Sequence, residues 1–100
     1  MKNILLIALF MTATFGVAIG APSGSVLFER CQPCHGADGS RVPYGAERTI
    51  KGLSEKDVVT ALEGYQAGTF GGAQKATMER MAAGLSKSDI NALATYISKF

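Results

Sequence analysis

The chain has 100 residues, of which 47% are hydrophobic and 18% charged, and its formal net charge at pH 7 is +2. Lys2 is the only charged residue among the first 20, so residues 21–100 carry a formal charge of +1. This near-neutral balance excludes a strongly basic nucleic-acid binder and an acidic disordered tail. A domain of 80 residues buries little surface, and such a domain often depends on disulfides, a metal or a large cofactor. The two cysteines are too few for a disulfide framework.

Residues 1–20 have the pattern of a cleaved secretory signal peptide. Lys2 forms the positive n-region, residues 4–11 are continuously apolar, and residues 18–20 fit a cleavage site. The apolar run is shorter than the roughly 20 residues that a membrane span needs. We therefore expect residues 21–100 to form one exported domain, periplasmic in a bacterium, with no stable membrane insertion after cleavage.

Three stretches of this domain have the apolar spacing of amphipathic helices. The first covers residues 23–34, and its apolar face carries both cysteines. The second begins at Ser54 and the third at Ser86, and each serine starts a capping box completed by an aspartate three residues later. A shorter helical segment is predicted over residues 74–83.

Gly-rich loops at residues 36–45 and 64–72 separate these helices, and no stretch shows the sustained apolar alternation of a strand. The predicted fold class is therefore all-α, with three to four short helices. The connection before Ser54 is about 18 residues long, which is unusual in a compact helical domain. This length indicates that the loop wraps a ligand or has a function of its own.

The chemistry is carried by Cys31-Gln32-Pro33-Cys34-His35, the C-x-x-C-H signature of c-type haem attachment. Two thiols at this spacing face one side of a helix end, where they can add to the two vinyl groups of one porphyrin edge. The next residue, His35, then lies under the macrocycle and can bind its iron. We predict one covalent haem c, with Cys31 and Cys34 as its thioether attachments and His35 as an axial iron ligand. Such a haem would also complete a core that the chain is too short to build alone.

Other interpretations of the two cysteines fit less well. A thioredoxin-like redox pair needs a βαβ unit and a larger chain. A disulfide between cysteines so close in sequence would stabilise little, and a zinc site would need four ligands. The leader favours haem, because c-type haem is attached after export.

The second axial ligand is not fixed by spacing. His35 is the only histidine, so the candidates are a methionine, a lysine or an open position. Met78 and Met81 are the methionines outside the leader, and they lie three residues apart after the second Gly-rich loop. A thioether ligand would raise the reduction potential, but either methionine also fits a packing role.

The chain resembles the class I cytochromes c, in particular the small bacterial cytochromes of the c-553 type. The matching stretches are residues 31–40, 64–65, 68–72 and 75–78, followed by the apolar pattern of residues 85–97. The resemblance implies the small cytochrome c fold, in which the first and last helices cross, with Gly24 permitting close approach and Phe28 near Tyr96. It also implies that Met78 is the axial methionine.

The resemblance departs from the family pattern below the haem. Many relatives have a proline there whose carbonyl accepts a hydrogen bond from the ligand histidine, whereas residues 47–50 of this chain read Glu-Arg-Thr-Ile. Because any residue has a carbonyl, this leaves open which one orients His35. The side chains that we expect to pack against the haem are Tyr44, Leu53, Leu62, Tyr65, Phe70 and Met81. A docking surface around the haem edge would draw on Arg41, Arg48, Lys51, Lys56 and Lys75, although scattered basic residues also fit a solvated surface.

With both axial positions filled, no substrate reaches the iron, so we predict an electron-transfer protein and not an enzyme. It would be a monomeric one-electron carrier that docks transiently with redox proteins, such as a dehydrogenase, a quinol-oxidising complex, an oxidase or a peroxidase. The alternative is a c-type haem protein with an open sixth position, acting as a gas sensor or weak peroxidase.

Overall fold

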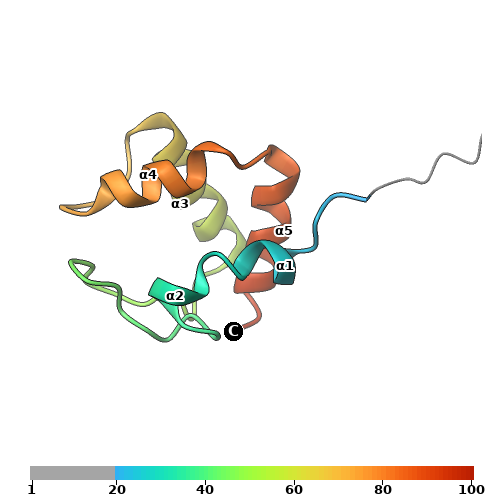
Figure 1. The fold of residues 1–100 in the computed structure, drawn as a ribbon, viewed down its shortest axis with the longest axis horizontal. Helices are drawn as coiled ribbons and strands as arrows, with labels where there is room; N and C mark the ends of the chain where they lie inside the picture. Colours follow the sequence, from blue (N-terminus) through green and yellow to red (C-terminus); the bar gives the residue numbers. More distant parts are fainter. Residues whose placement is uncertain (1–19) are drawn as a thin grey trace, which may run out of the picture.

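The computed structural model describes residues 20–100, and the leader predicted at residues 1–20 lies outside them except for Gly20. Within this range the chain forms helices and no strand (Figure 1). The helices are α1 (Gly24–Phe28), α2 (Gln32–His35), α3 (Glu55–Ala67), α4 (Lys75–Ala83) and α5 (Lys87–Ile97). The predicted all-α class is confirmed. None of the helices in residues 20–100 combines the length and apolar character that crossing a bilayer requires.

The single helix predicted over residues 23–34 is wrong, because the chain turns between α1 and α2. A continuous helix would press the ring of Pro33 against the carbonyl of Glu29 and leave that carbonyl without its helical donor. Pro33 lies instead in the first turn of α2, where a missing N–H costs nothing. This break gives five helices in the described residues where three to four were expected.

Both predicted capping boxes form. The Asp57 N–H donates to Ser54 Oγ at 3.1 Å, and the Ser54 N–H donates to the Asp57 carboxylate at 3.4 Å. The same pair of bonds joins Ser86 and Asp89, at 3.0 and 2.9 Å. These reciprocal bonds satisfy N–H groups that a helix start leaves free, which sets where α3 and α5 begin.

The Gly-rich loop expected at residues 64–72 is shorter than predicted, because residues 64–67 complete α3. The helix ends at Gly68, whose φ of +74° is in the left-handed region that favours glycine. Gly64 lies inside the helix under Phe70, whose Cβ would be only 2.6 Å from a Cβ at residue 64. The loop therefore folds back over α3, and the Phe70 and Tyr65 rings pack edge to face at 5.1 Å.

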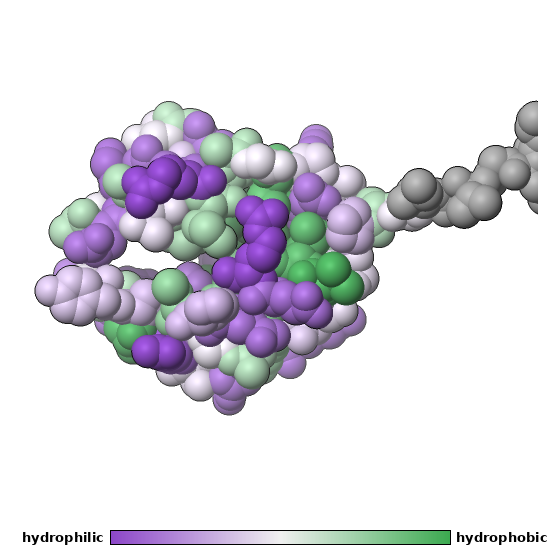
Figure 2. All heavy atoms as spheres, in the orientation of Figure 1, coloured by the Kyte–Doolittle hydropathy of each residue, from purple (hydrophilic) through white to green (hydrophobic). Residues whose placement is uncertain are grey.

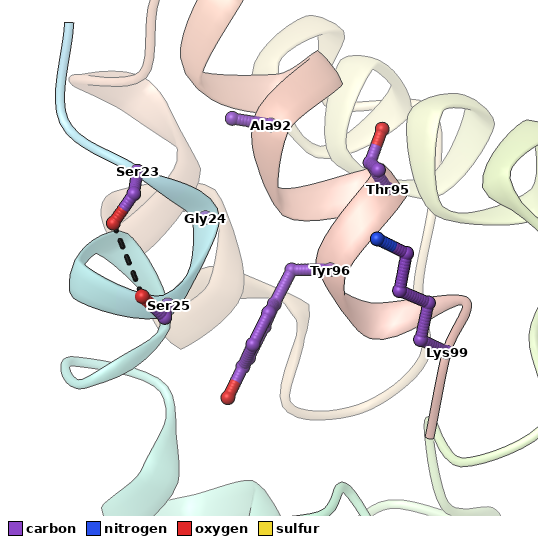
Figure 3. A pocket seen from close by; sticks show the side chains of 7 residues that line it. All are labelled: Ser23, Gly24, Ser25, Ala92, Thr95, Tyr96 and Lys99. Carbon is purple, nitrogen blue, oxygen red and sulfur yellow. Dashed lines mark hydrogen bonds between the residues drawn. The ribbon is translucent and has the colours of Figure 1, made fainter.

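Helices α1 and α5 cross as the resemblance implied. Gly24 faces Ala92 and Tyr96 of α5, and a Cβ at residue 24 would overlap the Ala92 carbonyl and the Tyr96 Cβ (Figure 3). The rings of Phe28 and Tyr96 pack with their centroids 5.6 Å apart. The close approach at Gly24 and the contact between the two rings are both confirmed.

The core lies between α1, α3, α4 and α5 and contains no buried polar or charged residue among those described. Its buried side chains are Phe28, Val58, Leu62, Ala82, Ile90, Leu93, Ala94 and Ile97. Six of these eight, all except Ile90 and Ala94, also line one large cavity. The core thus forms part of the wall of this cavity, which α2 and the long loop that follows it also line.

Candidate haem site

The cavity has a volume of about 1130 Å³ and receives side chains from all five described helices and from the loop of residues 43–50. In Figure 2 its mouth is visible as a slot between two lobes, which Figure 1 identifies as α3 with α4 above and α2 with the long loop below. Ordinary small-molecule pockets reach about 1,000 Å³. A cavity of this size in so short a chain has room for a macrocyclic cofactor.

All four predicted site residues line this cavity: Cys31, Cys34, His35 and Met78. The turn of α2 brings the first three together, and the His35 N–H donates to the Cys31 carbonyl at 3.0 Å. Both cysteines are free thiols, with Cys31 half-buried and Cys34 exposed. Burial raises the pKa of the Cys31 thiol, and the positive charge of Arg30 partly offsets that effect. The two thiols therefore stand at the same wall of the cavity.

His35 is half-buried, and this burial lowers the pKa of its imidazole. The neutral ring that results at pH 7 is the form that binds metals. His35 Nδ1 is buried and has no hydrogen-bond partner among the described residues. The carbonyl that the resemblance implied for His35 is thus not in place, although residues 47–50 do line the cavity.

The long loop is tied to α2 by Arg41. Its backbone N–H donates to the His35 carbonyl at 3.0 Å, and its guanidinium Nη1 donates to the Pro33 carbonyl at 3.1 Å. Further along, the Lys51 N–H donates to the Gly39 carbonyl at 3.0 Å. Arg41 and Lys51, expected on a docking surface, thus have a structural role as well, because they close the loop beneath α2.

Helix α4 carries both methionines to the cavity. Met78 and Met81 are each half-buried, and each lines the cavity. Met78 also packs against the buried core. Because both methionines line the cavity, this observation does not decide which of them is the axial ligand.

All six side chains predicted to pack against a haem do line the cavity, including Tyr44, which is 94% exposed. Sequence reasoning did not single out Leu27, Ile50, Val58, Leu85 and Leu93, which are cavity-lining residues as well. Leu27, Val58 and Leu93 lie on the apolar faces predicted for the first helix and for the helices at Ser54 and Ser86. The apolar spacing of the sequence therefore already indicated that these three side chains face inward. Of the five predicted docking residues, only Arg48 and Lys75 line the cavity.

The donor set fits a haem better than a bare metal ion. No group of three or more His, Cys, Asp or Glu side chains in residues 20–100 is arranged to hold a metal. A haem brings its own equatorial nitrogens, so the protein supplies only axial ligands. One neutral imidazole, two methionine sulfurs and two thiols around an apolar cavity meet that requirement.

Comparisons with known proteins agree with this geometry. The family model described as Cytochrome c matches residues 21–100. The chain is 37% identical over 101 residues to Cytochrome c-553 of Nitratidesulfovibrio vulgaris, covering 99% of each chain. It is 46% identical over 70 residues to Cytochrome c-553 of Desulfomicrobium norvegicum, covering 70% of this chain and 85% of the relative. Cytochromes c are electron carriers with a covalently bound haem c and its iron. The chain belongs to this family, as a small class I c-type cytochrome similar to the c-553 proteins.

Proposed function

We propose that residues 21–100 form a periplasmic one-electron carrier with His/Met axial ligation. Cys31 and Cys34 attach the haem, and His35 and Met78 bind its iron. The observation that carries this proposal is that all four side chains line one apolar cavity. A bound haem supplies reversible one-electron chemistry at its iron, and the protein sets the potential.

Helix α2 provides the attachment wall. The helix and its N-cap residue Cys31 bring both thiols to the cavity, and Arg41 holds the helix in place through the Pro33 and His35 carbonyls. Because His35 follows Cys34 directly, covalent attachment would keep the imidazole at a high effective concentration at its target. Burial keeps that imidazole neutral and ready to bind.

Helix α4 provides the opposite ligand. A methionine thioether is a soft donor that favours reduced iron and so raises the potential. The buried side chains of Leu62 and Leu93 line the same cavity and make the surroundings of this ligand apolar. With both axial positions filled, no general base, nucleophile or substrate site is required, which supports a carrier and not an enzyme.

The mouth of the cavity is the proposed docking surface. Arg48 and Lys75 line the cavity together with the exposed rings of Tyr44 and Phe70, and we assign these four side chains to its mouth. Such a small patch of mixed polarity fits weak, transient encounters. The proposed partners are a dehydrogenase, a quinol-oxidising complex, an oxidase or a peroxidase. We propose that the protein docks with them as a monomer, after residues 1–20 have been removed.

Optical spectra of the oxidised protein test the ligation. The wild-type protein should show a weak far-red ferric band, which Met78→Ala abolishes and Met81→Ala, the matched control, leaves intact. Cys31→Ala and Cys34→Ala should each leave one vinyl group of the haem unreacted, as read from a shift of the α band of the pyridine haemochrome to longer wavelength. A five-coordinate spectrum that Met78→Ala does not change contradicts the proposal and favours the open-site alternative.

A further inference from the structure

Gln66, in the last turn of α3, reaches across to the end of α4. Its Nε2 donates to the Ala82 carbonyl at 2.9 Å and to the Leu85 carbonyl at 2.8 Å. A primary amide has two N–H donors, so both are used. The acceptors belong to the last turn of α4 and to the connection that follows, where helix carbonyls lack intrahelical partners.

Helix α4 has few other polar attachments. Its N-cap residue, Gln74, makes no side-chain capping bond, in contrast to the capping boxes of α3 and α5. Within residues 20–100, the two bonds from Gln66 are the only side-chain hydrogen bonds that join another helix to α4 and its closing turn. The position of α4 along its axis therefore depends on Gln66 and on apolar packing.

The position of α4 along its axis decides which of the two methionines lies at the axial position of the haem iron. Residues three apart on a helix differ by about 60° around the axis and by about 4.5 Å along it. Met81 could replace Met78 only if α4 turned and slid by these amounts. Such a shift would break both bonds from Gln66, since hydrogen bonds tolerate only a few tenths of an ångström. It would also move Ala82, which is fully buried, out of the core.

We propose that Gln66 is a positioning residue that fixes the register of α4, so that Met78 and not Met81 is held at the axial position. This inference rests on the proposed His35/Met78 ligation. It assigns Gln66 no contact with the haem, because Gln66 does not line the cavity.

The test uses Gln66→Glu in the haem-loaded protein. Glutamate keeps the shape of glutamine, but its carboxylate donates no hydrogen bond and faces two carbonyl oxygens. The matched control is Glu63→Gln, one turn earlier on α3, at an exposed side chain with no hydrogen bond to a described residue. Gln66→Ala serves as a second variant if Gln66→Glu does not fold, as judged by far-ultraviolet circular dichroism.

In Gln66→Glu, the far-red band should disappear at a temperature well below the loss of helix signal. Carbon monoxide should bind the reduced protein about tenfold faster, the effect expected from losing two hydrogen bonds of ordinary net strength. In Met78→Ala combined with Gln66→Glu, a weak far-red band should return, because the freed helix can present Met81. Glu63→Gln should match wild type in both measurements.

Two results would overturn the register role. In the first, the far-red band of Gln66→Glu disappears at the same temperature as the helix signal, and the rate of carbon monoxide binding changes less than about twofold. Gln66 would then only support the structure, with no effect on the register of α4. In the other, the double variant shows the spectrum of Met78→Ala alone. A wild-type protein without a far-red band, or with one that survives Met78→Ala, would overturn the proposed ligation itself.

Discussion

Gly24 of α1 lies directly against the backbone carbonyl of Ala92 in α5, with no space for a side chain between them. This contact lets the first and last helices cross at backbone distance. It also brings the fully buried Phe28 ring onto Tyr96 and Phe100, with ring centroids 5.6 and 5.0 Å away. Phe28 lines the haem cavity as well, so the crossing positions one wall of the site.

Substitution of Gly24 by alanine should therefore destabilise the protein. The new methyl group would push against backbone and force α1 away from α5, at a cost of about 1–3 kcal/mol in the free energy of unfolding. Gly84→Ala is the matched control, since a Cβ there meets nothing within 4 Å. Denaturant unfolding of both haem-loaded variants measures the difference. Equal stabilities would show that α1 adjusts without loss.

The capping box of α3 should contribute measurably to stability. Ser54→Ala removes the oxygen that accepts from the Asp57 N–H and should lower the free energy of unfolding by about 1 kcal/mol. Ser54→Asp keeps an acceptor at the same position and should stay close to wild type. Chemical denaturation of the three proteins tests this, and an alanine variant as stable as the aspartate variant would refute it.

Asp38 should make stability depend on acid pH. Hydrogen bonds from the Ser40 side chain and backbone, with a smaller effect of Lys51, hold the pKa of its carboxyl below the usual value of 3.8. A lowered folded-state pKa contributes stability above pH 3.8, and this stability is lost as pH falls through the folded-state pKa. The contribution should be small, because this carboxyl is fully exposed.

Asp38→Asn is the variant that measures this contribution. Wild type should exceed Asp38→Asn in stability near neutral pH, and the two curves should converge as the pH falls below 3.8. Glu63→Gln serves as the control for removing an exposed carboxyl that has no hydrogen bond to a described residue. A gap between wild type and Asp38→Asn that persists at low pH would mean that the loop is not held by the ionised carboxylate.

Removal of the haem should cost the protein most of its cooperative structure. Six of the eight buried core residues also line the cavity, so a haem bound there packs against the core, and its removal takes away that apolar contact. Cys31→Ser combined with Cys34→Ser prevents covalent attachment and should lower the thermal midpoint strongly or abolish a cooperative transition. Circular dichroism melting against the wild-type holoprotein measures this. A similar sharp transition in both would show that the chain folds without its cofactor.

The sequence predicted the start of α3 and of α5 to the residue, because a capping box is a local signal carried by Ser54 and Ser86 themselves. It did not predict the break between α1 and α2, since apolar spacing continued through both. Pro33 was the available signal, and its steric effect on the preceding turn outweighs periodicity.

The candidate site likewise contains residues whose position could be predicted from the sequence and residues whose position could not. Cys31, Cys34 and His35 stand together in sequence, so their shared wall of the cavity follows from one short helix. The bonds from Gln66 to Ala82 and Leu85 join residues 16 and 19 positions apart, and depend on how α3 packs against α4. No local pattern signals that arrangement, and none signals that Nδ1 of His35 is buried without a hydrogen-bond partner among the described residues.

A potentiometric titration of the haem-loaded protein, followed by addition of carbon monoxide to the reduced form, tests whether the protein is an electron carrier with both axial positions of its iron filled. A carrier with iron held by His35 and Met78 should give a single one-electron transition, and carbon monoxide should leave the reduced spectrum unchanged over minutes. An immediate shift of the reduced spectrum on adding carbon monoxide would contradict the proposed ligation, because it would show an open iron position and a ligand-binding protein in place of an electron carrier.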